Sequence, residues 1–150
     1  MEKRINVFAK GMGALKPLFD MGNHSKESSL GTELIELVHV RVSQINQCAY
    51  CLDMHTKEAR AKGETEQRLY GLSAWRETPY YTDRERAALA WAEAVTAAHV
   101  PDEIYNKVKD YFSEIELIDL TLAVTAINTW NRVNLAFPSV AGTYKVGMFE

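Results

Sequence analysis

Apolar residues recur at helical spacing through the middle of the chain. They are dense between Thr32 and Gln44, where the alternation across residues 38–42 would also suit a β-strand. This segment is longer than an ordinary strand. Glu33 and Glu36 also stand where acidic side chains stabilise the start of a helix. The pattern therefore predicts a helix over residues 32–44.

Two capping boxes predict where later helices begin. Thr82 is followed by Glu85, and Ser113 is followed by Glu116, so each pair can satisfy two free backbone N–H groups. Pro101 is well placed to begin a helix between them, because the first turn of a helix needs no N–H from proline. These signals predict helices beginning near residues 82, 101 and 113.

Glycine and proline divide the rest of the chain. No convincing strand pair and no repeat is present in the sequence. We therefore predict an all-α helical bundle of about six to seven helices, formed by residues 1–150 as a single domain. The remaining expected segments are a weak helix over 5–21, a loop over 22–31, a helix to Lys62 that Gly63 ends, a helical stripe at 69–75, and an irregular tail after Pro138.

Composition indicates the cellular setting. The 150 residues carry a net charge of −3, with 47% hydrophobic and 25% charged residues, as in ordinary soluble domains. The sequence has no basic block for nucleic acid or an anionic membrane, no apolar run of about 20 residues, and no segment of signal-peptide type. We therefore expect a cytoplasmic protein with no nucleic-acid or membrane partner. In that reducing compartment, closely spaced cysteines indicate catalysis or metal binding.

The two cysteines of the chain lie beside a histidine in the segment Cys48-Ala-Tyr-Cys51-Leu-Asp-Met-His55. On a helix these three side chains share one face. A thiolate forms near neutral pH when a base or cation is close, and a second thiol within reach lets it close a disulfide. The spacing therefore indicates a dithiol redox centre.

A carboxylate is predicted to complete this centre. If the chain reverses near residues 44–47, Glu36 lies opposite His55 on antiparallel helices, because both are equally far from the turn. Glu36 would orient His55, and His55 would take the proton of Cys51 so that the thiolate attacks. Cys48, at the start of its helix, would resolve the oxidised intermediate as a disulfide.

The same residues allow other interpretations. In one alternative, the two cysteines are simply small buried apolar side chains. Cys48, Cys51, His55 and Glu36 form a candidate zinc ligand set, although a structural zinc site usually has two spaced ligand pairs. A thioredoxin-like domain would need a βαβ pattern, which the sequence lacks. The contrasting function is a non-catalytic oligomeric module that senses oxidation or binds a metal. We favour the redox enzyme, with no metal and no cofactor.

Glu36, the Cys48-Ala-Tyr-Cys51 pair and His55 resemble the signature of the alkylhydroperoxidase D-like proteins of the carboxymuconolactone decarboxylase superfamily. The resemblance extends from Leu30 to Phe137. It includes the flanking segments 44–48, 55–60, 72–79, 84–91 and 127–132.

The resemblance implies an all-helical fold that assembles as a homo-oligomer, commonly a trimer or hexamer. It also implies that the residue matching Cys51 attacks a hydroperoxide and becomes a sulfenic acid, with which Cys48 condenses to a disulfide. Glu36 and His55 would shuttle the proton. An external dithiol, or a redox protein that carries one, would return the pair to the reduced state.

One position departs from the family pattern. Tyr50 stands where the best-studied members have a histidine directly before the second cysteine. Tyrosine is a poor base at neutral pH because its ordinary pKa is about 10. We therefore expect a shorter proton relay and weaker peroxidase turnover than the family name suggests.

Other polar residues receive simpler interpretations. His39 lies among valines and is interpreted as a packed core or interface histidine with satisfied hydrogen bonds. Glu33 lies one turn from Glu36 and competes with it for the place opposite His55. A polar edge on the last helix either lines the redox pocket or contacts a subunit, and it consists of Asn128, Asn131 and Arg132.

Overall fold

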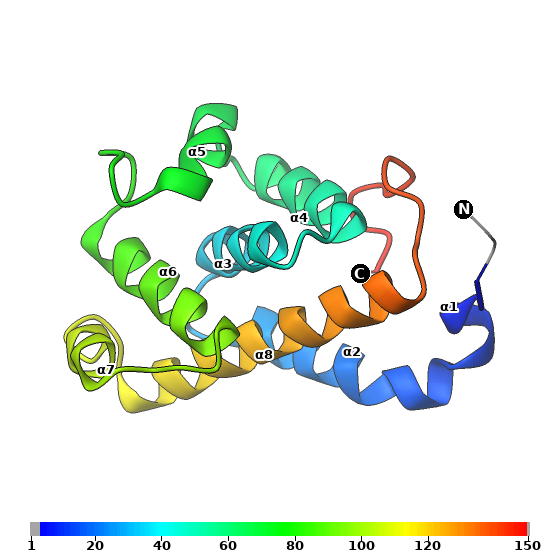
Figure 1. Ribbon diagram of the computed structural model, residues 1–150, viewed down its shortest axis with the longest axis horizontal. Coiled ribbons are helices and arrows are strands. Elements are labelled where there is room, and N and C mark those ends of the chain that lie inside the picture. The colour runs from blue at the N-terminus through cyan, green and yellow to red at the C-terminus, as the bar shows by residue number, and fades with distance from the viewer. Residues whose placement is uncertain (1–3, 150) are drawn as a thin grey trace.

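The computed structural model describes residues 4–149, and within that range all regular structure is helical. This range contains eight α-helices and a short 3₁₀-helix after α5, and Figure 1 shows how the α-helices are arranged. The all-α prediction is confirmed, and the count exceeds the expected one because the segment predicted as one helix over 5–21 contains the two helices α1 and α2, which meet at Gly11. The bounds are α1 (Val7–Lys10), α2 (Met12–Glu27), α3 (Thr32–Ile45), α4 (Ala49–Ala61), α5 (Glu66–Gly71), η1 (Leu72–Ala74), α6 (Asp83–Thr96), α7 (Asp102–Val108) and α8 (Glu114–Ala136).

Helix α3 lies at the centre of the bundle (Figure 1). It packs against α4, α6 and α8, while α2 runs along α8 and α7 packs against α6. Val38 and Val42 join a hydrophobic cluster with residues of α6 and α8, whereas Leu37 and Val40 join a second cluster with α4 and α6. A helix buried on several sides needs apolar residues on most of its surface. This position explains the nearly continuous apolar run that resembled a strand.

Both capping boxes form as predicted. The Thr82 hydroxyl accepts from the Glu85 N–H while the Glu85 carboxylate accepts from the Thr82 N–H, and α6 begins at the next residue. Ser113 and Glu116 make the same exchange at the start of α8. These contacts are local in sequence, so the capping residues alone predicted them.

The predicted loop over 22–31 is wrong for its first six residues. Helix α2 continues to Glu27 and contains Pro17 and Gly22 in its interior. Its packing along α8 buries Leu15, and Ser25 is buried as well, with its hydroxyl donating to the Met21 carbonyl. Tertiary packing therefore outweighs the low helix propensity of glycine and proline here.

The polar edge of α8 holds the turn between α3 and α4. The Asn46 side chain donates to Asn128 and Asn131 at 2.9 Å each, and the Asn131 amide donates to the Ser43 hydroxyl at 3.1 Å. Asn131 is completely buried, so these hydrogen bonds meet its need for partners. Asn128 and Asn131 thus support the turn that carries the cysteine pair.

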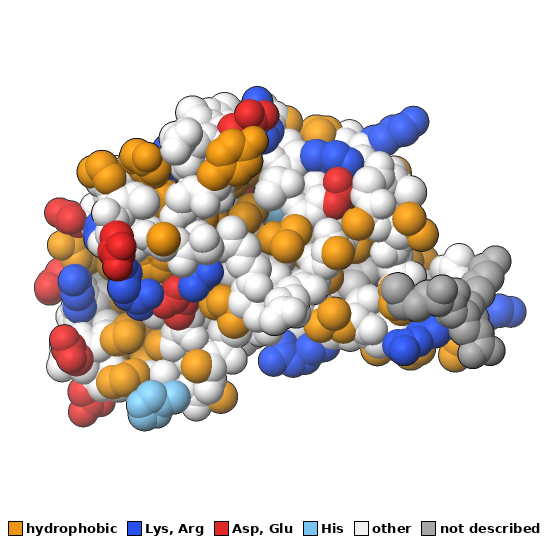
Figure 2. Space-filling model, turned by 45° about the horizontal axis from the view of Figure 1, so that its top comes forward, with side chains coloured by type: hydrophobic (Ala, Val, Ile, Leu, Met, Phe, Trp, Pro, Cys, Tyr) orange, Lys and Arg blue, Asp and Glu red, His pale blue; other side chains and the backbone are white. Residues whose placement is uncertain are grey.

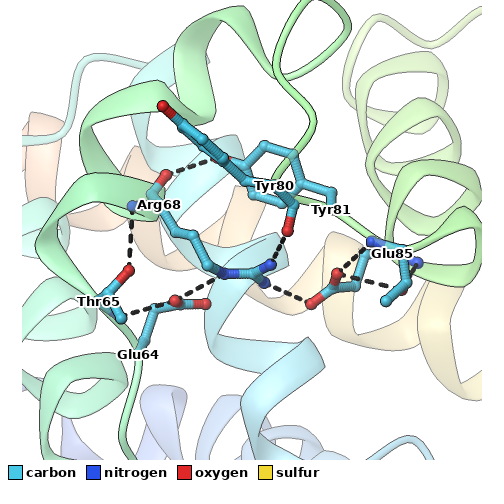
Figure 3. A network of polar contacts seen from close by, with 7 residues as sticks. Glu64, Thr65, Arg68, Tyr80, Tyr81 and Glu85 are labelled. Atoms are coloured by element: carbon cyan, nitrogen blue, oxygen red, sulfur yellow. Dashed lines mark hydrogen bonds and ion pairs between the residues drawn. The ribbon is translucent and has the colours of Figure 1, made fainter.

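Arg68 connects α5 to the beginning of α6 (Figure 3). Its guanidinium donates to Glu64 at 2.8 Å and to Glu85 at 2.5 Å, and also to the Tyr80 carbonyl. The Tyr81 hydroxyl donates to the Arg68 carbonyl at 2.5 Å. One side chain therefore fixes the connection that follows α5 against the capping box of α6.

Charges of both signs are interspersed on the face drawn in Figure 2, with hydrophobic side chains distributed among them. Among the residues described, no helix is long and apolar enough to cross a membrane.

Candidate active site

The cysteine pair lies at the start of α4. Cys48 is the N-cap residue, and its sulfur accepts from the Cys51 backbone N–H at 3.4 Å. The two sulfurs are joined as a disulfide, with the Cα atoms 5.3 Å apart. Exposure of each cysteine is at most 1%, and both belong to the cluster of α3, α6 and α8. One helical turn therefore brings the two sulfurs together inside the protein.

Glu36 of α3 and His55 of α4 meet across the helical hairpin. His55 Nδ1 donates to Glu36 Oε2 at 2.8 Å, and both residues are buried. Glu33 is exposed on the same helix, so the structure selects Glu36 from the two candidates. Burial opposes ionisation of Glu36, but the hydrogen bond and the charge of His55 outweigh it and lower the pKa of this carboxyl. The pair predicted from equal distances to the turn is present.

A lysine stands beside this carboxylate. Lys62 Nζ lies 3.8 Å from Glu36 Oε1 and 3.2 Å from Glu58 Oε2. Burial opposes ionisation of Glu58, yet hydrogen bonds from Tyr144, Gly147 and Lys62 lower the pKa of its carboxyl. Because Tyr144 and Gly147 belong to the C-terminal tail, the same carboxylate holds the tail against α4.

His39 joins the Glu36–His55 pair, which corrects its interpretation as a satisfied core histidine. Its ring packs edge-on against His55, with the centroids 4.6 Å apart. Both ring nitrogens are closed to solvent, and neither makes a well-formed hydrogen bond among the described residues, the backbone of Ala123 giving only a weak contact. Burial lowers the pKa of His39 to about 3, and the charge of His55 adds to this effect. The sequence did contain a signal for this placement. His39 lies three residues after Glu36, which places both side chains on one face of the helix.

A cavity of about 150 Å³ opens beside these three residues. Glu36, His39 and His55 contribute to its lining, together with Tyr50 of α4. Most of the lining is apolar, and aromatic side chains from both ends of the chain enclose it: Phe8, Phe19, Trp130, Tyr144 and Phe149. In this disulfide state the lining contains neither cysteine.

Asn134 of α8 lies between the disulfide and the cavity. Its amide nitrogen is 3.8 Å from the Cys51 sulfur, and the residue also lines the cavity. Its side-chain oxygen is buried without a hydrogen-bond partner among the described residues. The sequence carries no local signal for this role, since Asn134 lies 83 residues from Cys51.

Tyr50 lines the cavity beside the Cys51 backbone and packs edge-on against Tyr144. Burial, assisted by the charge of Asp53, raises the pKa of Tyr50. Its hydroxyl is therefore protonated at neutral pH and can donate a hydrogen bond but is not a base.

Comparison with known proteins gives consistent matches. The profile of the carboxymuconolactone decarboxylase family matches residues 14–94. The uncharacterized protein YdfG of Bacillus subtilis is 40% identical over 146 residues, which cover 95% of this chain and 99% of YdfG.

Two solved structures are also similar. A protein of unknown function from Agrobacterium tumefaciens, described as a putative antioxidant defence protein AhpD, is 40% identical with a TM-score of 0.90. That match covers 95% of this chain and 100% of the other. An uncharacterized peroxidase-related protein from Silicibacter is 25% identical with a TM-score of 0.81, over 96% of this chain and 78% of the other.

Proposed function

Because the chain belongs to the carboxymuconolactone decarboxylase family, we propose that it is a thiol-dependent peroxidase that reduces hydroperoxides through Cys51 and Cys48. The observation that carries the proposal is a disulfide-forming pair one helical turn from a buried carboxylate–imidazole pair. The names of the two similar solved structures agree with a peroxide-related role. The proposal assigns this activity to residues 1–150 as one domain.

Reaction begins with the reduced pair. His55 Nδ1 is occupied by Glu36, so Nε2 is the nitrogen that takes the proton of the Cys51 thiol. The Cys51 thiolate attacks the terminal oxygen of the hydroperoxide, and the O–O bond breaks. The leaving alkoxide takes the proton from His55 and departs as an alcohol, while Cys51 becomes a sulfenic acid.

The second step closes the disulfide. The Cys48 thiolate attacks the Cys51 sulfur, and the S–O bond breaks. The leaving hydroxide combines with the proton from Cys48 and departs as water. The two electrons that reduced the peroxide thus come from the two thiols, and an external dithiol or a redox protein must supply them again.

Two further features of the site support this proposal. The Asn134 amide, 3.8 Å from Cys51, is placed to donate to a thiolate in the reduced state. The cavity beside His55 gives a hydroperoxide with an apolar body a place next to the relay. The oxidised sulfurs do not line that cavity. The proposal therefore requires the Cys51 side chain to move toward the cavity when the disulfide is reduced.

Intact mass spectrometry after alkylation tests the proposal. We expect a stoichiometric pulse of tert-butyl hydroperoxide to remove both alkylation sites from the reduced protein and to lower its mass by two hydrogens. Dithiothreitol should restore both sites. In the Cys48→Ser variant, the same pulse should leave a sulfenic acid that dimedone traps on Cys51.

Peroxide consumption separates an enzyme from a redox sensor. The Cys51→Ser variant should consume hydroperoxide no faster than buffer with dithiol. Consumption at the wild-type rate would refute the proposed nucleophile. Disulfide formation without turnover by any dithiol would favour the non-catalytic sensing module instead.

A further inference from the structure

Glu36, His39 and His55 form a compact group of metal-ligand atoms. Glu36 and His39 are one turn apart on α3, and His55 faces them from α4. One nitrogen or oxygen from each side chain lies within 4.8 Å of the others. A glutamate and a histidine three residues apart on a helix both project to the same side, as in metal sites built inside helical bundles.

His39 supplies an independent reason to expect a ligand. Both of its nitrogens are closed to solvent without a well-formed hydrogen bond among residues 4–149, apart from a weak contact with the Ala123 backbone. A buried polar group of this kind usually has a partner, such as an ion or an ordered water. The residue lines the cavity, so a small ligand there can reach its ring. A neutral imidazole offers one lone pair, which is the form in which histidine binds metals.

We propose that Glu36, His39 and His55 bind a divalent transition-metal ion of the zinc class. Two imidazoles and a carboxylate are the ligands found in zinc sites that keep an open coordination position. The open position would face the cavity. Glu36 and His55 are already 2.8 Å apart through their hydrogen bond. Binding the ion breaks that hydrogen bond and releases its proton to solvent, so the metal-bound form lacks the proton relay proposed above. The thiols are not part of this set, because the disulfide occupies them.

Lys62 provides a second test of the proposed metal site. Its ammonium lies 3.8 Å from Glu36, where a positive charge opposes a cation. The closer contact of Lys62 is with Glu58, at 3.2 Å, so the lysine keeps a partner when Glu36 turns to a metal. Replacing Lys62 by Met should therefore tighten metal binding several-fold. A loose association of Zn²⁺ with surface groups would not respond in this way.

Equilibrium dialysis of the tag-free 150-residue chain against Zn²⁺ tests the site. The protein is first oxidised, with complete loss of free thiols checked, so that the cysteines cannot bind the metal. We expect about one ion per chain. His39→Gln should weaken binding at least about tenfold, since even outer-shell changes affect metal affinity by that factor. His24→Gln is the matched control, because His24 is a half-exposed histidine paired with Asp119 on other helices.

The proposal is overturned if the wild type binds far less than one ion, or if His39→Gln binds as tightly as wild type. If that variant fails to fold by circular dichroism, cobalt absorption of the oxidised wild type decides instead. Ligand-field bands without a thiolate charge-transfer band support the site, and unchanged aqueous cobalt bands refute it. Disulfide formation after a peroxide pulse is measured with chelator present, so failure of either proposal is recognised separately.

Discussion

At the scale of single residues, Glu36 carries the charge on which the proposed relay depends. Its carboxyl remains ionised inside the protein because His55 and the more distant lysine compensate for burial. Neutral glutamine would keep the size of the side chain but remove this charge. The glutamine oxygen can still accept from His55, but the negative charge that stabilises the imidazolium formed when His55 takes a proton would be lost.

We therefore expect Glu36→Gln to slow peroxide consumption by roughly 100-fold, the lower end of the usual contribution of a positioned proton carrier. The initial rate at saturating dithiol measures the effect. Glu33→Gln is the control, because Glu33 is exposed one turn away on the same helix and should leave the rate unchanged. A Glu36→Gln rate equal to that of wild type would remove Glu36 from the relay.

The residues of the site differ in how far the sequence predicts them. Glu36 and His55 pair because they are equally far from one short turn, and this distance along the chain can be counted from the sequence. His39 has the same helical face, but its lack of a partner depends on what surrounds it after folding. Asn134 reaches Cys51 from 83 residues away, and such a contact depends on how α8 packs.

At the scale of helices, Glu93 of α6 connects its own helix to two other parts of the chain. Its carboxylate accepts from Arg41 of α3 at 2.7 Å, from the Trp75 indole at 2.8 Å, and from Arg76 at 2.6 Å. Burial opposes its ionisation, but these hydrogen bonds and the arginine charges lower the pKa of Glu93. The carboxylate thus connects α3 and α6 with the segment that follows η1.

We expect Glu93→Gln to lower the free energy of unfolding by about 2 kcal/mol at pH 7, the scale of hydrogen bonds to charged groups. A pKa that is lower in the folded state gives stability that is present above 4.5, the ordinary value, and is lost as the pH falls through the folded value. The difference between variant and wild type should therefore shrink below pH 4.5. Urea unfolding at several pH values measures it, and a constant difference down to pH 2 would contradict this account.

At the scale of helices, some helix ends follow from local sequence and others depend on tertiary packing. The beginnings of α6 and α8 follow from Thr82 and Ser113, because a capping box involves only residues within one turn. The end of α2 does not, since its last turns contain Gly22 and depend on contacts with α8. The sequence therefore predicted the helices with local capping more accurately than the helix stabilised by a distant one.

At the scale of the whole molecule, the two ends of the chain close the cavity together. Figure 1 shows α1 and the C-terminal tail at the same end of the molecule. Phe149 lies 6.1 Å from Phe8, and Phe19 packs edge-on against Trp130 at 5.1 Å between ring centroids. The Tyr144 hydroxyl donates to Glu58 and fixes the tail in this position. Access to the cavity therefore depends on the terminal segments.

Tyr144→Phe should loosen the tail while keeping the aromatic ring. We expect the free energy of unfolding to fall by about 1–3 kcal/mol, because the variant leaves a buried carboxylate with one hydrogen bond fewer. Hydrogen exchange of residues 140–149 should become faster. Tyr70→Phe serves as the control, since Tyr70 is 70% exposed and its change should alter neither measurement. Unchanged exchange in Tyr144→Phe would show that other contacts hold the tail.

The outer face of α8 bears on the predicted homo-oligomer. Ile115 and Ile118 are 72% and 68% exposed, and Leu122 continues the same face one turn later. Exposed apolar side chains in such a row are typical of a surface that another subunit covers. The family resemblance predicts a trimer or hexamer, and this face is where we expect subunits to meet.

Sedimentation equilibrium of the wild type should therefore give about three or six times the single-chain mass of 17.0 kDa. Ile118→Glu should lower that mass, because it places a charge in a surface that must lose its water on assembly. Val140→Glu is the control, since Val140 is 71% exposed and lies in the tail outside α8. A wild type that sediments as a single chain would contradict the predicted assembly. If Ile118→Glu still assembled, the interface would have to lie on another face, because a buried, unpaired carboxylate at a subunit contact costs more than the contact gains.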